Sequence, residues 1–85
     1  DGLRGFADAM RRGVPADGPE ARELAEQHRE GLGRGVDDCG YEMHRNLGEM
    51  YVADERFTAT VDVVAPGLAA YVRDAIVANA TAHQG

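Results

Sequence analysis

The chain has 85 residues, a net charge of −6 and a single cysteine, and these three features exclude several classes of protein. A chain of this length forms one small domain, whose stability is marginal unless a partner, a ligand or a covalent link supports it. The lone cysteine cannot close an internal disulfide, the acidic balance disfavours nucleic acid, and no apolar run approaches the roughly 20 residues that span a bilayer.

A lone thiol is typical of a reducing compartment, so we expect a cytoplasmic protein that does not bind membranes. No secretory signal is visible. The chain begins at Asp1 rather than at a methionine, so we expect a C-terminal fragment of a longer protein in which residues 1–85 form one domain.

Two helices are predicted in the first part of the chain. Apolar residues recur at three- and four-residue spacing over residues 3–12, which predicts a helix that stops at Gly13. Pro19 suits the first position of a second helix, because its missing N–H costs nothing there. Gly31, Gly33 and Gly35 predict the end of that helix, or a hinge, just before segment 39–57. Its apolar stripe consists of Ala21, Leu24, Ala25, His28 and Leu32.

Three further helices complete the predicted fold. The third begins near Asp37 or Asp38, which suit an N-cap, and runs to about Ala53. Asp54 suits a new cap, so a short fourth helix runs from Glu55 to about Val64, although its β-branched residues leave a strand as an alternative. Pro66 opens a fifth helix that ends near Ala82. We therefore predict an all-α domain, a small bundle of four to five short helices. The inner face of the last helix consists of Leu68, Tyr71, Val72, Ala75, Ile76 and Asn79.

The segment 39–57 is the most informative part of the sequence. It holds the only cysteine, two of the three tyrosines, two of the three methionines and one of the two phenylalanines. Such side chains at helical spacing either fill a core or line a pocket for a large apolar ligand, and the residues alone leave both interpretations open. Gly40 and Gly48 likewise fit either close helix packing or room for a ligand. The aromatic and thioether set consists of Tyr41, Met43, Met50, Tyr51 and Phe57.

The sequence gives little support for catalysis or metal binding. Cys39 near a helix start could gain thiolate character, but His44 lies about 140° around the helix from it, and no third group orients the pair. The three histidines do not have the spacing of a helical zinc site, and the glycine-rich segment 31–35 lacks the lysine and hydroxyl of a P-loop. We expect no enzyme, no cofactor and no metal, and we expect His28 and His44 at an interface or a pocket rim.

Several runs of residues resemble the TipAS antibiotic-recognition domain. They cover residues 39–44, 47–58, 66–71, 73–76 and 78–80, and the similarity extends over most of the chain from Ala25 onward. The resemblance implies a globin-like, all-helical domain that forms the C-terminal half of MerR-type transcription activators or is made alone as a drug-trapping protein. It implies thiopeptide antibiotics as ligands, which are large, sulfur-rich, apolar macrocycles, and N-terminal helices that fold over the bound ligand.

One position departs from the family pattern. The resemblance implies two cysteines seven residues apart, the second of which attacks a dehydroalanine of the antibiotic. Cys39 matches the first cysteine, but Asn46 occupies the second position. An amide cannot perform that addition, so the departure argues against covalent capture through position 46 and leaves reversible binding possible. Cys39 is a candidate substitute, two helical turns away on the same side.

We therefore predict binding of a thiopeptide-type or similar large hydrophobic antibiotic. The domain itself is expected not to contact nucleic acid, while the longer protein binds promoter DNA and forms a homodimer. His44 and Asn46 are expected at the polar edge of the site. The alternative is a structural or protein-interaction helical module without a small-molecule ligand. The predicted ligand contacts are Cys39, Tyr41, Met43, His44, Asn46, Leu47, Met50, Tyr51 and Phe57.

Overall fold

The computed structural model describes residues 2–32 and 40–84, and this part of the chain folds into five helices and contains no strand. The predicted all-α architecture is thus confirmed, and the open alternative of a strand after Asp54 is wrong. The helices are α1 (Gly2–Arg11), α2 (Pro19–Leu32), α3 (Tyr41–Ala53), α4 (Glu55–Asp62) and α5 (Leu68–Gln84).

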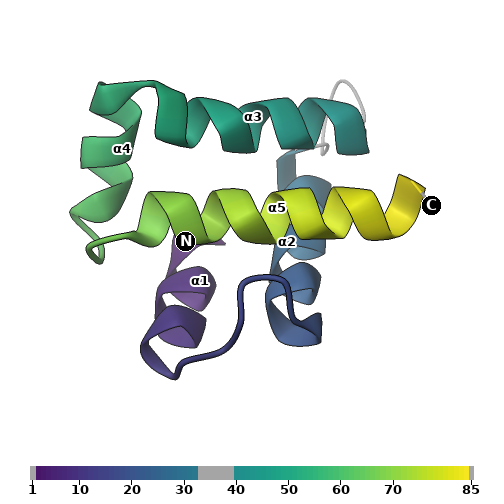
Figure 1. Ribbon diagram of the computed structural model, residues 1–85, viewed down its shortest axis with the longest axis horizontal. Helices are drawn as coiled ribbons and strands as arrows, with labels where there is room; N and C mark the ends of the chain where they lie inside the picture. The colour runs from purple at the N-terminus through teal and green to yellow at the C-terminus, as the bar shows by residue number, and fades with distance from the viewer. Residues whose placement is uncertain (1, 33–39, 85) are drawn as a thin grey trace.

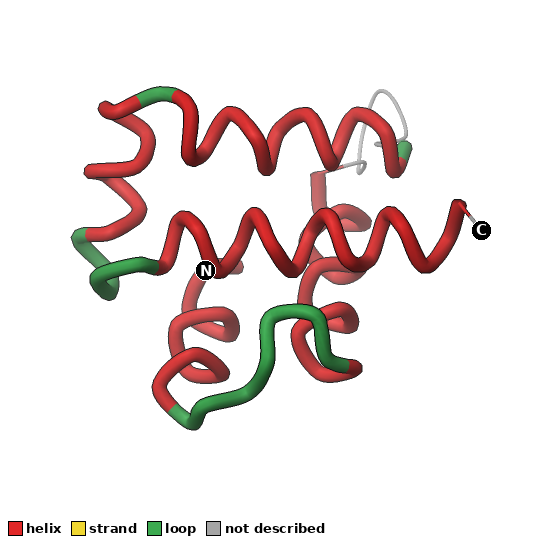
Figure 2. Tube along the Cα trace, viewed as in Figure 1, coloured by secondary structure: helices red, strands yellow, loops and turns green. Residues whose placement is uncertain are grey.

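Helix α5 occupies the middle of the molecule. Figure 1 shows α3 running antiparallel beside α5, α4 linking their ends, and α1 and α2 lying on the other side of α5 at a steep angle to it. Figure 2 shows that the described connections between the helices are short. Because α5 contacts all four other helices, it holds the two parts of the fold together.

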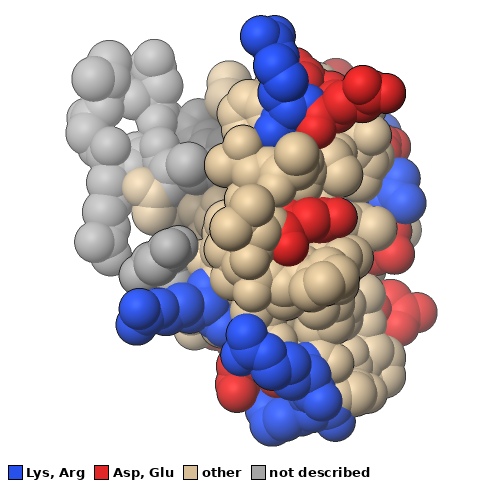
Figure 3. Space-filling model, turned by 90° about the vertical axis from the view of Figure 1, so that its left-hand side faces the viewer, with Lys and Arg blue, Asp and Glu red and all other residues tan. Residues whose placement is uncertain are grey.

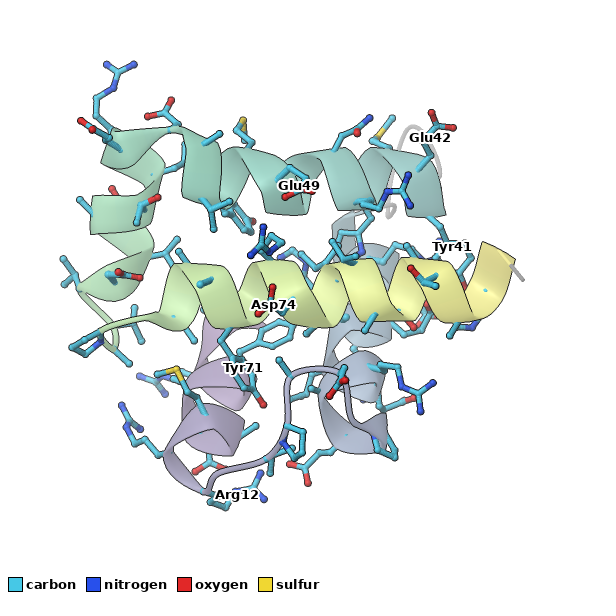
Figure 4. The ribbon with its side chains drawn as sticks, in the orientation of Figure 1. Arg12, Tyr41, Glu42, Glu49, Tyr71 and Asp74 are labelled. Carbon is cyan, nitrogen blue, oxygen red and sulfur yellow. The ribbon has the colours of Figure 1, made fainter. Side chains whose placement is uncertain are left out.

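The core follows the inner face that the sequence predicted for the last helix. Leu68, Val72 and Ile76 of α5 are fully buried, and Phe6 of α1 is buried with them. Tyr71 is only half-buried, but its hydroxyl donates a hydrogen bond of 2.8 Å to the carbonyl oxygen of Val14. Figure 4 shows the Tyr71 ring reaching from α5 toward the connection between α1 and α2. This bond therefore attaches that connection to the central helix.

Several helix boundaries agree with the sequence. Pro19 begins α2, Glu55 begins α4, and Gly13, two residues after the end of α1, takes a left-handed φ of +78°. The prediction that Pro66 opens the last helix is wrong, because α5 begins at Leu68 after Gly67, whose φ is +84°. The third helix begins later than the sequence predicts. In the described residues α3 begins at Tyr41, with Gly40 as an extended N-cap, whereas Asp37 and Asp38 lie outside the described part.

Gly48 allows α3 and α5 to approach closely. A Cβ atom at Gly48 would lie 3.3 Å from Cγ2 of Ile76, which is tighter than ordinary van der Waals contact. Between the two interpretations of this glycine, the structure favours close helix packing. At Gly40, no atom of the described residues lies within 4 Å of such a Cβ atom, so packing among these residues does not account for this glycine.

None of the described helices combines the length and apolar character that crossing a membrane requires.

Candidate ligand-binding site

Helix α3 presents two different faces. His44, Gly48 and Tyr51 are buried, whereas Met43 and Met50 are 60% and 37% exposed. The aromatic and thioether set of the sequence is therefore divided, because the side chains at 43 and 50 lie on a stripe of α3 rotated away from the one that reaches the core.

A single residue, Asp54, separates α3 from α4. It has an extended backbone, and its carboxylate accepts a hydrogen bond of 2.9 Å from the backbone N–H of Arg56, as an N-cap does. The chain therefore turns sharply after Ala53, and Phe57 in the first turns of α4 lies beside Tyr51, with ring centroids 5.7 Å apart. The Phe57 side chain is still 41% exposed.

Two open hollows lie at this corner. One, of about 350 Å³, is lined by Asp54, Arg56, Phe57 and Thr60. The other is wider, about 580 Å³, and is lined by Met50, Ala53, Asp54, Glu55 and Arg56. They share Asp54 and Arg56, so they form one surface at the corner. We call this surface, together with Met43 and Asn46 further along α3, the elbow surface.

The elbow surface combines apolar area with the charged side chains of Asp54, Glu55 and Arg56. Figure 3 views the molecule from the α4 side and shows a mostly uncharged centre that contains an acidic side chain, with arginines toward the upper and lower edges and acidic residues at the upper right and along the right-hand edge. Methionine side chains adapt to ligands of varied shape, and an exposed phenylalanine offers a flat apolar face. The surface is therefore suited to hold a large apolar molecule, with Asp54, Arg56 and Asn46 available for polar contacts.

The two central histidines form a pair in which His44 is buried and His28 is half-buried. Nδ1 of His28 and Nε2 of His44 lie 2.8 Å apart, and the two rings are stacked with centroids 5.1 Å apart. His44 is fully buried, so its predicted place at a polar edge is wrong. Burial lowers the pKa of His28, and burial, followed by the proximity of His28 and Arg29, lowers the pKa of His44 to about 4.

A polar cluster occupies the other end of α3. The Glu26 carboxylate accepts hydrogen bonds from Arg29, Asn79 and the Tyr41 hydroxyl, and these donors, Arg29 first, lower its pKa to about 2. The Tyr41 ring stacks on His83 with centroids 4.5 Å apart, and the Arg29 guanidinium lies 4.3 Å from the same ring centre. Figure 4 shows Tyr41 directed toward the end of α5, whereas Glu42 points away from it.

The predicted contact residues are therefore divided by the structure. Met43, Asn46, Met50 and Phe57 are exposed on the elbow surface. Tyr41, His44, Leu47 and Tyr51 are engaged by other parts of the protein, and Leu47 packs against the hydrophobic core. Cys39 lies outside the described residues.

Five residues that line the hollows are absent from the contacts predicted by the sequence, namely Ala53, Asp54, Glu55, Arg56 and Thr60. Arg56 and Thr60 were placed only within a helix, and Asp54 only as a cap. The Asp-Glu-Arg sequence after an apolar helix was a usable signal, because a cap directly after a helix end brings the two helix termini together.

The described side chains include no group of three or more histidine, cysteine, aspartate or glutamate residues placed to hold a metal ion.

Comparison with known proteins identifies the class to which this helical domain belongs. The TipAS antibiotic-recognition domain family matches residues 1–79, so the chain belongs to that family. It is 59% identical over 80 residues to the HTH-type transcriptional activator TipA of Streptomyces coelicolor and, equally, of Streptomyces lividans. The aligned part is 94% of this chain but 32% of each activator, so the chain spans about a third of these relatives.

Two solved structures share the fold. One is TipAS of Streptomyces lividans in complex with nosiheptide, from a thiopeptide antibiotic multidrug resistance system, with a TM-score of 0.87 and 57% identity. The other is the antibiotic-binding domain of a TipA-class multidrug resistance transcriptional regulator, with a TM-score of 0.88 and 57% identity. Each alignment covers 96% of this chain, and 57% and 87% of the respective structures. The resemblance inferred from the sequence is confirmed.

Proposed function

We propose that this domain binds a thiopeptide-type or similar large hydrophobic antibiotic on the elbow surface. Within its longer protein, it acts as the effector-sensing domain of a MerR-type transcription activator in the cytoplasm. The DNA-binding part of that protein is separate, and the longer protein forms a homodimer. A free-standing form of the domain would sequester the drug. No step of this function requires catalysis.

The observation that supports this proposal most strongly is the exposure of Met50 and Phe57 beside open hollows at one corner of the fold, with Met43 exposed on the same side of α3. A domain of this size gains little by leaving such side chains in water. Covering them with an apolar ligand contributes about 25 cal/mol for each Å² of apolar surface removed from water. The nosiheptide complex of the similar TipAS supplies the ligand class.

The proposed capture is reversible. Asn46 is exposed on the elbow surface, where it can donate and accept hydrogen bonds, but an uncharged amide is not a nucleophile. The ligand is therefore held by apolar contact and hydrogen bonds, and its binding shifts the domain toward the bound conformation by mass action.

The test is calorimetric titration of the domain with nosiheptide. We expect saturable binding by the wild type, and weakening by about tenfold or more for Met50→Ala and for Phe57→Ala, because each truncation removes apolar contact of roughly 1.5–3 kcal/mol. Mass spectrometry of the mixture should show no stable adduct, or at most one on Cys39.

Val63→Ala provides the matched control. Val63 is a large apolar residue that is 84% exposed, and it does not line either hollow, so its truncation should leave the affinity unchanged. Wild-type protein that fails to bind nosiheptide and related thiopeptides would refute the proposal. Equal losses for Val63→Ala and Phe57→Ala would place the ligand elsewhere.

A further inference from the structure

We propose that Thr58 is a positioning residue for ligand binding, because its hydroxyl ties the start of α4 to the end of α3 and thereby holds Phe57 against Tyr51, with the open face of Phe57 at a hollow. This inference rests on the proposed function, since it names a residue that shapes the elbow surface without lining either hollow.

The end of α3 leaves carbonyl groups without helical donors. The last four C=O groups of any α-helix lack an intrahelical partner and need one from elsewhere. Here the N–H of Asp54 donates to the carbonyl of Met50, and the chain then leaves the helix. The next carbonyl, that of Tyr51, accepts a hydrogen bond of 2.5 Å from the Thr58 hydroxyl instead. A side chain of α4 thus satisfies a group at the end of α3.

This bond is a second attachment at the elbow. The first is Asp54 itself, whose carboxylate accepts from the N–H of Arg56 and whose carbonyl accepts from the N–H of Thr58 at 2.9 Å. The far end of α4 is held by its packing on α5 and by the bond from the N–H of Ala69 to the Asp62 carboxylate. The Thr58 hydroxyl holds the near end, because it ties the first turns of α4 to a fixed point on α3.

The consequence concerns the neighbouring residue, Phe57. Its ring packs on Tyr51 at an interplanar angle of 32°, and Tyr51 is only 9% exposed, so one face of Phe57 is anchored while the other borders a hollow. If the first turns of α4 rotate, the open face of Phe57 turns away from the hollow that it borders, and the elbow surface loses part of its apolar lining. A ligand would then bind only after the elbow is restored, which weakens the apparent affinity.

The experiment compares nosiheptide affinities of Thr58→Val and Thr58→Ser at a temperature where both are folded by circular dichroism. Valine keeps the shape of threonine but has no hydroxyl, whereas serine keeps the hydroxyl. We expect Thr58→Val to bind about fivefold more weakly, in line with the loss of one hydrogen bond, and Thr58→Ser to bind within twofold of the wild type. Nuclear Overhauser contacts between the Tyr51 and Phe57 rings should weaken only in Thr58→Val.

Two controls separate positioning from general stability. Thr81→Val makes the same exchange at an exposed position of α5, and Ile76→Val lowers stability from within the core, away from the elbow. Both should retain wild-type affinity. Equal affinities of the wild type and Thr58→Val would overturn the role of Thr58 and leave the proposed function intact. Failure of the wild type to bind overturns the proposed function. The contacts between the Tyr51 and Phe57 rings still test the role of Thr58 in that case, because they are measured without ligand.

Discussion

At the scale of single residues, His44 shows how a titratable group can be part of a core. Its Nε2 atom is paired with Nδ1 of His28, while its Nδ1 atom is buried without a hydrogen-bond partner in the described part of the chain. An unpaired buried lone pair costs less than an unpaired buried N–H, so we infer that Nε2 of His44 carries the proton and donates it to His28. This arrangement requires both rings to be uncharged.

The pair predicts a loss of stability on mild acidification. The folded-state pKa values of both histidines are lowered, that of His44 to about 4, whereas an unfolded histidine titrates near 6.5. The neutral form stabilises the fold fully above pH 6.5, and this contribution is lost as the pH falls from 6.5 toward 4. We expect the free energy of unfolding to fall by on the order of 1 to 2 kcal/mol between pH 7.5 and 5.0, measured by thermal unfolding.

Histidine variants can show which residues cause this pH dependence of stability. His44→Phe and His28→Phe should each reduce the difference in Tm between pH 7.5 and 5.0, because each removes one of the two rings whose pKa burial lowers. Glu26 does not contribute in this window. Its pKa is lowered from 4.5 to about 2, so the stability that it adds is present above about pH 4.5 and is lost only below that. An unchanged difference in His44→Phe would contradict the assignment.

At the scale of elements, the close contact between α3 and α5 depends on the absence of a side chain at Gly48. Gly48→Ala should destabilise the fold by about 1 kcal/mol, because overpacking against the fully buried Ile76 outweighs the helix propensity of alanine. Chemical denaturation with urea measures this change.

Gly31→Ala is the matched control within another helix. A Cβ atom at Gly31 meets nothing within 4 Å, so here only the helix propensity changes, and the fold should gain up to about 1 kcal/mol. If both variants shift the urea midpoint in the same direction, close packing at Gly48 is not the reason for that glycine.

Helix starts and ends could be predicted where the sequence carries a local signal. Pro19 and Asp54 act through their own backbone geometry or side chain, so their effect is readable in a short window. The pairing of His28 with His44 joins residues of two different helices, and the sequence around either residue carries no signal that predicts this contact. For the same reason the sequence placed Tyr41 in the ligand site, although its ring is held by Arg29 and His83.

At the scale of the whole molecule, the fold separates a packed centre from an open corner. Helix α5 and its neighbours bury Phe6, Leu68, Val72 and Ile76, whereas the corner between α3 and α4 leaves apolar side chains exposed. The sequence showed that soft and aromatic residues gather in segment 39–57, but not which of them face outward. That division depends on the rotation of α3 against α5, which is set by contacts between helices far apart in the chain.

The three methionines provide a direct test of this division. Met43 and Met50 lie exposed on the elbow surface, while Met10 of α1 is half-buried against the core on another side of the fold. With ¹³C-labelled methionine methyl groups, the domain gives one signal for each position, which Met→Leu variants assign. Met10 then serves as an internal reference in the same sample.

The decisive measurement is titration of this labelled domain with nosiheptide, followed by methyl spectra and by Overhauser contacts between methyl groups and ligand. We predict saturable shifts and ligand contacts at Met43 and Met50, without ligand contacts at Met10. Ligand contacts confined to Met10, or a saturable complex in which neither Met43 nor Met50 is touched, would contradict the proposal that the antibiotic binds at the corner between α3 and α4.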